Sequence, residues 1–126
     1  MKHEFFSDGT TKKISWVIHT GDSQVEQTRK QAEIYLDKVN DEQAKYIALH
    51  VGIFWGIGTF IIKNEDVVTV KLDSKSMYEH LANNSEISDP FIQTRSEFIK
   101  RLIDQRKLDV KYHLIEPKNN PASKLL

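Results

Sequence analysis

A run of basic residues in the last third of the chain has the composition of a nucleic-acid contact. It contains three arginines that one helix could present, Arg95, Arg101 and Arg106. Guanidinium groups spaced along a helix can follow the phosphates of a nucleic acid. Glu97 and Asp104 are interleaved with these arginines, so a solvated face of mixed charge is the alternative interpretation.

The histidines and the absence of cysteine limit which other chemistry is possible. Five histidines, at positions 3, 19, 50, 80 and 113, show no spacing typical of zinc ligands, so we interpret them as ordinary surface, strand or helix residues. A chain without cysteine forms neither disulfides nor thiolate metal sites, which fits a reducing compartment. We therefore expect a cytoplasmic protein.

Length and charge set further limits. A chain of 126 residues can bury one hydrophobic core but not two, so we expect a single domain over residues 1–126. Eighteen Lys and Arg balance eighteen Asp and Glu, so any site for a polyanion must be a local patch. The longest apolar stretch, Tyr46 to Ile62, is interrupted by His50 and three glycines and is too short to span a membrane. We expect a buried helix there and no membrane segment.

The first third of the chain predicts strands. His3–Ser7 and Ile14–Thr20 are rich in aromatic and β-branched residues and flank a turn-forming Asp-Gly-Thr, which indicates a β-hairpin. Residues 24–39 give conflicting signals, because their composition favours helix whereas the alternation around Ile34 favours an edge strand. We favour a strand over residues 30–37.

The rest of the chain predicts helices between two strands. Asp41 is suited to cap a helix whose apolar residues recur every three or four positions as far as Trp55. Val67–Leu72 is the clearest strand, and the Asp73-Ser74 pair after it can cap the next helix, which places Asp73 at the C-terminal edge of the sheet. Pro90 opens a further helix, and Val110–Ile115 forms the last strand before a short helical tail. This order predicts a mixed sheet with helices on its faces.

Both the order of elements and four segments resemble the ribonuclease H superfamily, in particular its small ribonuclease HI, reverse transcriptase-like members, over nearly the whole chain. The segments are Phe5-Phe6-Ser7-Asp8-Gly9, Ala44-Lys45-Tyr46-Ile47-Ala48-Leu49, Val70-Lys71-Leu72-Asp73-Ser74, and Val110 to Ile115 leading to Asn119-Asn120-Pro121-Ala122-Ser123. The resemblance implies an α/β, ribonuclease H-like fold with a mixed five-stranded sheet whose first three strands are antiparallel.

In that family, four carboxylates hold two Mg²⁺ ions that cleave the RNA strand of an RNA–DNA hybrid. By position in the motifs, Asp8 matches the first carboxylate and Asp73 the third. Lys45 stands in place of the second, the Glu of an Ala-Glu-Tyr-x-Ala-Leu pattern. Ser123 stands in place of the fourth, the Asp of an Asn-x-x-Ala-Asp pattern.

A lysine in place of a glutamate removes a metal ligand and adds a positive charge where a dication would sit. We therefore predict that the Lys45 ammonium replaces a cation and forms ion pairs with Asp8 and Asp73. In the alternative interpretation, Glu42, one helical turn before Lys45, enters the site as a substitute acid.

Three functional hypotheses follow. The first is a degenerate ribonuclease H-like protein that retains binding to nucleic acid, such as an RNA–DNA hybrid, with weak or no hydrolysis and with no cofactor or only weakly bound Mg²⁺ or Mn²⁺ at Asp8 and Asp73. The second is an active, divalent-metal-dependent ribonuclease H that uses Glu42 together with the two aspartates. The third is a non-enzymatic protein-interaction module, which the zero net charge would suit.

Overall fold

The computed structural model describes residues 1–126 and contains one mixed sheet of five strands in the order β3-β2-β1-β4-β5. The strands are β1 (Lys2–Gly9), β2 (Lys13–Thr20), β3 (Ser23–Lys30), β4 (Val67–Leu72) and β5 (Asp109–Leu114). Strands β1, β2 and β3 pair antiparallel, whereas β4 pairs parallel with both β1 and β5. The predicted five-stranded mixed sheet, with its first three strands antiparallel, is confirmed.

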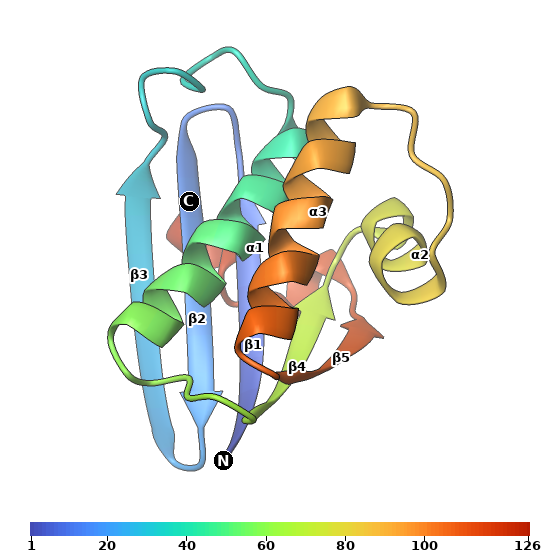
Figure 1. Ribbon diagram of the computed structural model, residues 1–126. Helices are drawn as coiled ribbons and strands as arrows, with labels where there is room; N and C mark the ends of the chain where they lie inside the picture. Colours follow the sequence, from blue (N-terminus) through green and yellow to red (C-terminus); the bar gives the residue numbers. More distant parts are fainter.

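Three α-helices accompany the sheet: α1 (Asp41–Gly58), α2 (Lys75–Asn83) and α3 (Pro90–Gln105). Helices α1 and α3 lie side by side over one face, and α2 lies beside them near the edge formed by β5 (Figure 1). The C-terminal tail, with short 3-10 turns at Pro117–Asn119 and Ser123–Leu125, lies behind the sheet on its opposite face. No helix has both the length and the apolar character that crossing a membrane requires.

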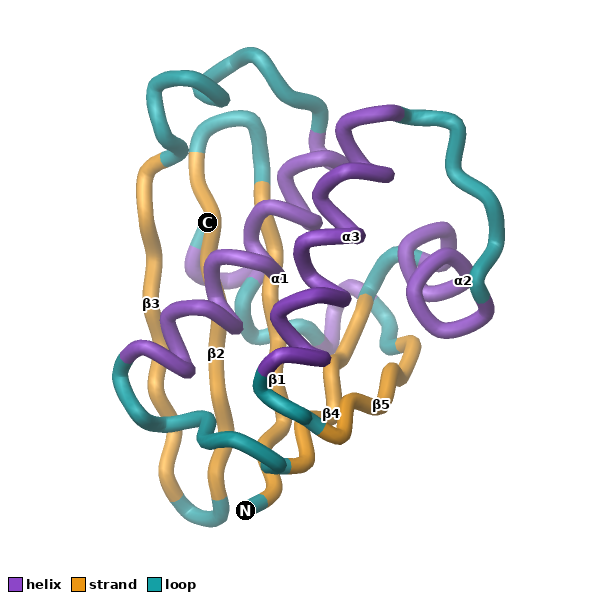
Figure 2. The backbone as a smooth tube through the Cα atoms, in the orientation of Figure 1, coloured by secondary structure: helices purple, strands orange, loops and turns teal.

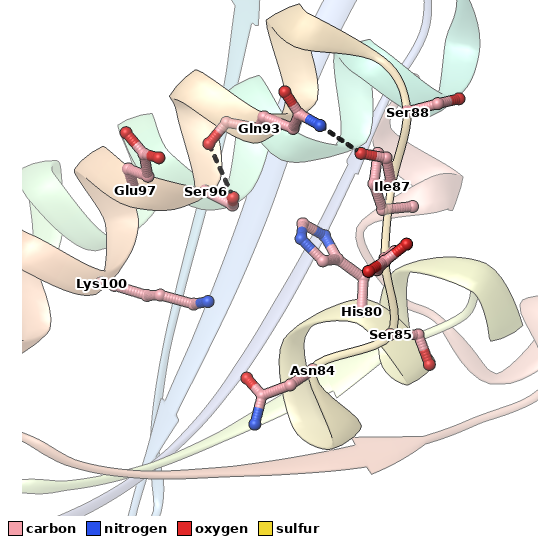
Figure 3. Close-up of a pocket in the computed structure, with 10 residues that line it drawn as sticks. His80, Asn84, Ser85, Ile87, Ser88, Gln93, Ser96, Glu97 and Lys100 are labelled. Atoms are coloured by element: carbon pink, nitrogen blue, oxygen red, sulfur yellow. Dashed lines mark hydrogen bonds between the residues drawn. The ribbon is translucent and has the colours of Figure 1, made fainter.

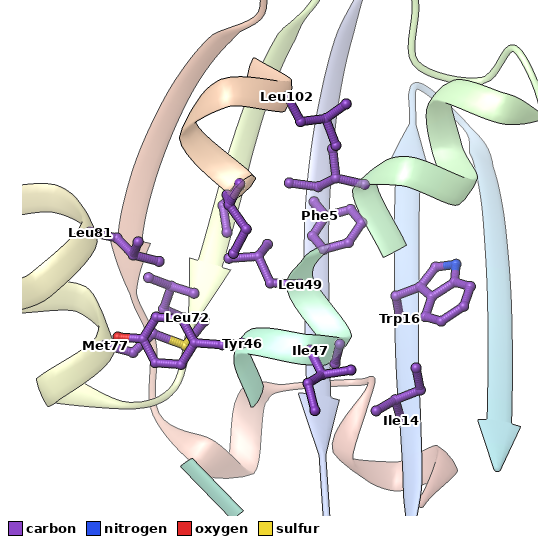
Figure 4. Close-up of a cluster of buried hydrophobic side chains, with 14 of the residues drawn as sticks. Phe5, Ile14, Trp16, Tyr46, Ile47, Leu49, Leu72, Met77, Leu81 and Leu102 are labelled. Carbon is purple, nitrogen blue, oxygen red and sulfur yellow. The ribbon is translucent and has the colours of Figure 1, made fainter. Parts of the chain in front are cut away.

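The hydrophobic core lies between the sheet and the helices. Its main cluster contains 21 buried residues, against three in a cluster on the opposite face, so the helical side contributes most of the hydrophobic stabilisation. Phe5 of β1 and Trp16 of β2 are fully buried in this core, on the side of the sheet that α1 covers (Figure 4). The ring of Trp16 also packs against that of Trp55, with 5.8 Å between the centroids.

The strand predicted over residues 30–37 is wrong. The third strand is β3, Ser23–Lys30, and residues 31–40 form the turns and loop that lead into α1 (Figure 2). The amide N–H groups of Tyr35 and Leu36 both donate to the carbonyl of Ala32, which closes a tight turn. The sequence SQVEQTRK of β3 lacks a strong apolar alternation because this strand lies at the sheet edge, where most of its side chains are exposed.

The predicted cap of α1 is also displaced by one residue. Asn40, not Asp41, is the N-cap, and its side chain accepts a hydrogen bond from the backbone N–H of Gln43, while the Gln43 side chain accepts one from the N–H of Asn40. This reciprocal pair is a capping box. Asp41 is the first helical residue, where its negative charge still favours the helix N-terminus.

Candidate functional site

Two aspartates meet at one edge of the sheet. Asp8 lies near the end of β1, and Asp73 directly follows the neighbouring strand β4. Because β1 and β4 run parallel with Phe6 opposite Lys71, their C-terminal ends lie side by side. The first turns of α1 cross this edge, since a Cβ atom added at Gly9 would lie 2.5 Å from the carbonyl oxygen of Ala44.

Lys45 extends from α1 and contacts both aspartates. Its Nζ atom lies 2.7 Å from Oδ1 of Asp8 and 3.0 Å from Oδ1 of Asp73. The predicted ion pairs are therefore present. The side chains of Asp8 and Asp73 are only 11% and 5% exposed and that of Lys45 21%, so water and salt screen these charges less than they would at the surface.

Donors from the protein also occupy the remaining carboxylate oxygens. Oδ1 of Asp8 accepts from the N–H of Gly9 at 2.8 Å, and Oδ2 accepts from the hydroxyl of Ser123 at 2.5 Å. Oδ2 of Asp73 accepts from the side-chain amide of Asn120 at 3.0 Å. Each carboxylate oxygen of the pair thus has a donor, and two donors come from the C-terminal tail.

The electrostatics favour the charged form of Lys45. Burial by itself lowers the pKa of its ammonium, but the hydrogen bonds to Asp8 and Asp73 and the attraction of their charges outweigh it, so the pKa is raised above its ordinary value. Asp8, Lys45 and Asp73 form a trio of charged side chains. Its two carboxylates and one ammonium give it a net charge of −1.

The residues of this trio do not fit a divalent cation. Magnesium takes about six oxygen ligands at close range and is repelled by a fixed positive charge. Here an ammonium lies between the two inner carboxylate oxygens, and nowhere in the chain are three or more His, Cys, Asp or Glu side chains arranged to hold a metal ion. A dication would have to displace Lys45 before it could bind.

Comparison with known proteins finds matches to the structure of this chain but none to its sequence among family models and curated proteins. The structure superposes on ribonuclease H1 of the archaeon Halobacterium salinarum with a TM-score of 0.76 and 16% identity, covering 99% of this chain and 94% of that one. The chain has the ribonuclease H-like fold. The resemblance seen in the sequence is confirmed at the level of the fold.

Two further solved structures agree. The N-terminal ribonuclease H domain of a Mycobacterium tuberculosis protein superposes with a TM-score of 0.72 at 18% identity, covering 98% of this chain and 89% of that one. LC11-RNase H1, solved in complex with an RNA/DNA hybrid, superposes with a TM-score of 0.71 at 15% identity, covering 98% of this chain and 91% of that one.

Within this ribonuclease H-like fold, Glu42 lies near the trio but is engaged elsewhere. Its Oε1 accepts hydrogen bonds from the hydroxyls of Ser74 at 2.7 Å and Ser76 at 2.8 Å. These bonds join α1 to the start of α2 beside Asp73, and Glu42 makes no ion pair with Lys45. Its role as a substitute acid stays a prediction, and would require it to leave both serines.

The three arginines do not form one surface. Arg95 is held inside a small aromatic cluster, where it donates to the hydroxyl of Tyr35 at 2.6 Å and its guanidinium lies over the rings of Tyr35 and Phe91. Arg101 and Arg106 are exposed. Arg106 follows the last residue of the 16-residue helix α3. The first turn of α3 meets the first turn of α1, which carries Lys45, so Arg106 lies about 24 Å along the helix from that end. Their binding role stays a prediction.

A large polar hollow lies away from the trio. It lies between α2 and α3 beneath the loop that joins them, has a volume of about 710 Å³ and is lined almost entirely by polar side chains (Figure 3). His80 is buried at its wall, with Nδ1 2.8 Å from the hydroxyl of Tyr46. Burial, and secondarily the charge of Lys100, lowers the pKa of His80.

Sequence reasoning missed two contributors to the trio. Asn120 hydrogen-bonds both Asp73 and the backbone carbonyl of Ser7, but it occupies a position that the Asn-x-x-Ala-Asp pattern leaves unspecified. Gly9 lets β1 approach α1 closely, and no local pattern marks such a contact, because Ala44 is 35 residues away in the chain.

Proposed function

We propose that this chain is a ribonuclease H-like domain that binds nucleic acid, in the first place an RNA–DNA hybrid, with weak or no hydrolysis. The observation that carries the proposal is the Lys45 ammonium between Asp8 and Asp73. Support for the hybrid as ligand is the similarity in fold to LC11-RNase H1, whose structure contains an RNA/DNA hybrid.

The chemistry of the trio supports binding without cleavage. Hydrolysis by two metal ions requires cations that lower the pKa of water and stabilise the leaving oxygen. An ammonium offsets one of the two carboxylate charges but has no open coordination position for water. Because the pKa of Lys45 is raised, this group stays protonated at neutral pH and does not act as a base there either.

Cleavage of a labelled RNA–DNA hybrid in Mg²⁺ and in Mn²⁺ tests the absence of hydrolysis. The Asp73→Asn variant, purified in parallel, controls for contaminating nuclease. We expect the wild type to cleave no faster than Asp73→Asn. Cleavage by the wild type that vanishes in Asp73→Asn would contradict the proposal, and its loss in Glu42→Gln as well would identify Glu42 as the substitute acid.

Fluorescence anisotropy tests the binding. Labelled hybrid, DNA duplex and single strand are titrated with metal-free protein at several salt concentrations. We expect saturable binding of the hybrid that weakens as salt rises, because phosphate contacts release counterions. If no nucleic acid binds in a salt-dependent way, the proposal is wrong and a protein-interaction module becomes the better description.

A further inference from the structure

The face of the sheet opposite α1 and α3 is covered at one end only. Alternate residues of a strand share a face, so Glu4, Phe6 and Asp8 of β1 all point to this side. Phe6 packs with Val17 and Ala122 of the tail. Beyond that cluster, a hollow of about 620 Å³ opens around Glu4, and no residue of the tail lines it.

Basic side chains from three strands surround this hollow. Lys2, His19, Lys111 and His113 line it, and Glu4 is its one acidic residue. Across the sheet, Glu4 is paired with both His19 and Thr69, and Thr69 with Lys111, so these side chains form one row. Neither lysine forms an ion pair with a carboxylate. In a chain with zero net charge, this is the kind of local positive patch that an anion requires.

Two histidines, His19 and His113, bring ring nitrogens to this hollow, and Nε2 of His19 lacks a partner within the protein. Nδ1 of His113 accepts a hydrogen bond from Nζ of Lys71 at 3.4 Å, and this lysine brings a further positive charge to the rim. The ring of His19 packs against Phe6 at 5.2 Å between centroids, and its Nε2 is buried without a hydrogen-bond partner. A buried nitrogen without a partner costs free energy, which the ring recovers if it turns toward an acceptor in the hollow.

We propose that this hollow binds a phosphate group. Lys2 of β1 and Lys111 of β5 supply charge, while His19, Thr69 and His113 supply donors to different oxygens. A tetrahedral dianion has acceptors in several directions, which suits donors from four strands better than a planar carboxylate does. The site is remote from Lys45 in the fold, and it is independent of the function proposed above.

Removal of a charge from the hollow should change the affinity for phosphate in a direction that depends on the sign of that charge. Glu4 repels an anion, so removal of its charge tightens binding, whereas removal of the Lys111 charge weakens it.

Titration of ¹⁵N-labelled full-length protein with inorganic phosphate, followed by NMR, tests the proposal. We expect saturable shifts at His19, Thr69, Lys111 and His113 that chloride of equal ionic strength does not produce, with Asp8, Lys45 and Asp73 unmoved. Lys111→Gln weakens binding roughly three- to ten-fold, Glu4→Gln tightens it, and the exposed control Lys38→Gln leaves it unchanged. Unsaturable shifts, or equal effects of Lys111→Gln and Lys38→Gln, would overturn it.

Two further ligands distinguish the sources of the phosphate. One is adenosine monophosphate, and the other is a ten-residue oligothymidylate without terminal phosphates. Stronger binding of the oligonucleotide than of inorganic phosphate at the same residues supports a nucleic-acid backbone as the ligand. Binding of the monophosphate alone supports a free nucleotide. If none of these probes binds saturably, the proposal is wrong.

Discussion

Asp8 and Lys45 can meet because the residue after Asp8 has no side chain. A Cβ atom at Gly9 would lie 2.5 Å from the carbonyl oxygen of Ala44 and 2.7 Å from its carbonyl carbon, and a helix backbone cannot move aside as a flexible side chain can. We expect Gly9→Ala to reduce the free energy of unfolding by about 1–3 kcal/mol. Gly58→Ala, where nothing lies within 4 Å of the added carbon, is the matched control. Equal urea midpoints for the two variants would contradict this role of Gly9.

A second residue-scale prediction concerns Asp66, which is buried beside His3. Burial alone would raise its pKa, but hydrogen bonds donated by His3 at 2.7 Å and by the backbone N–H of Lys63 lower the pKa from 3.8 to about 2. A depressed carboxyl pKa stabilises the folded state above the ordinary pKa, and this stabilisation is lost as the pH falls through the folded value.

We therefore expect Asp66→Asn to be less stable than the wild type at pH 7, by about 1–3 kcal/mol. The difference should shrink between pH 4 and pH 2, because the wild-type carboxylate is then protonated too. Urea unfolding of both proteins over this range measures the difference directly, since the other carboxylates titrate alike in both. A difference that does not depend on pH would show that the charge of Asp66 is unimportant.

The trio was predictable from sequence because its members occupy recognisable motif positions. Asp8 lies near the end of β1 and Asp73 directly follows β4, and the replacement of an expected acid by Lys45 was visible in a single segment. The supporting contacts of Gly9 and Asn120 were not predictable, because they join segments that are distant in the chain and depend on how the elements approach each other.

At the scale of elements, α1 depends on its capping box. Asn40→Ala removes the side-chain acceptor of the Gln43 N–H and should reduce stability by about 1 kcal/mol. Asp41→Ala removes only a charge near the helix N-terminus and should cost less. Thermal unfolding of both variants ranks the two positions, and a larger effect of Asp41→Ala would contradict the assignment of Asn40 as the cap.

The elements that sequence predicted correctly carry their own signals. Strand β4 is apolar and β-branched, α2 begins at the Ser74 cap, and α3 begins at Pro90. Strand β3 has no such signal, because an edge strand that exposes most side chains is defined by its pairing with β2. Residues 32–36 alternate like a strand, yet they form a turn that packs Tyr35 against Phe91. Tertiary contacts decide both segments.

At the scale of the whole molecule, the chain is expected to unfold in one step. We propose that residues 1–126 are one cooperative domain, because Trp16 of β2 and Trp55 of α1 pack together and Asn120 of the tail bonds Asp73 after β4. Tryptophan fluorescence should report loss of core packing, and far-ultraviolet circular dichroism should report loss of helix. The two unfolding curves in urea should coincide. Separate midpoints would show that part of the chain unfolds independently.

The replacement of a cation by Lys45 is tested most directly by thermal unfolding of the wild type and of Lys45→Glu, each with and without Mn²⁺. We expect the melting temperature of the wild type to be unaffected by Mn²⁺. Lys45→Glu should melt lower without metal, because three carboxylates then repel one another, and should be stabilised as Mn²⁺ binds the folded state. A wild type stabilised by Mn²⁺, or a Lys45→Glu variant that melts like the wild type in both conditions, would contradict the replacement.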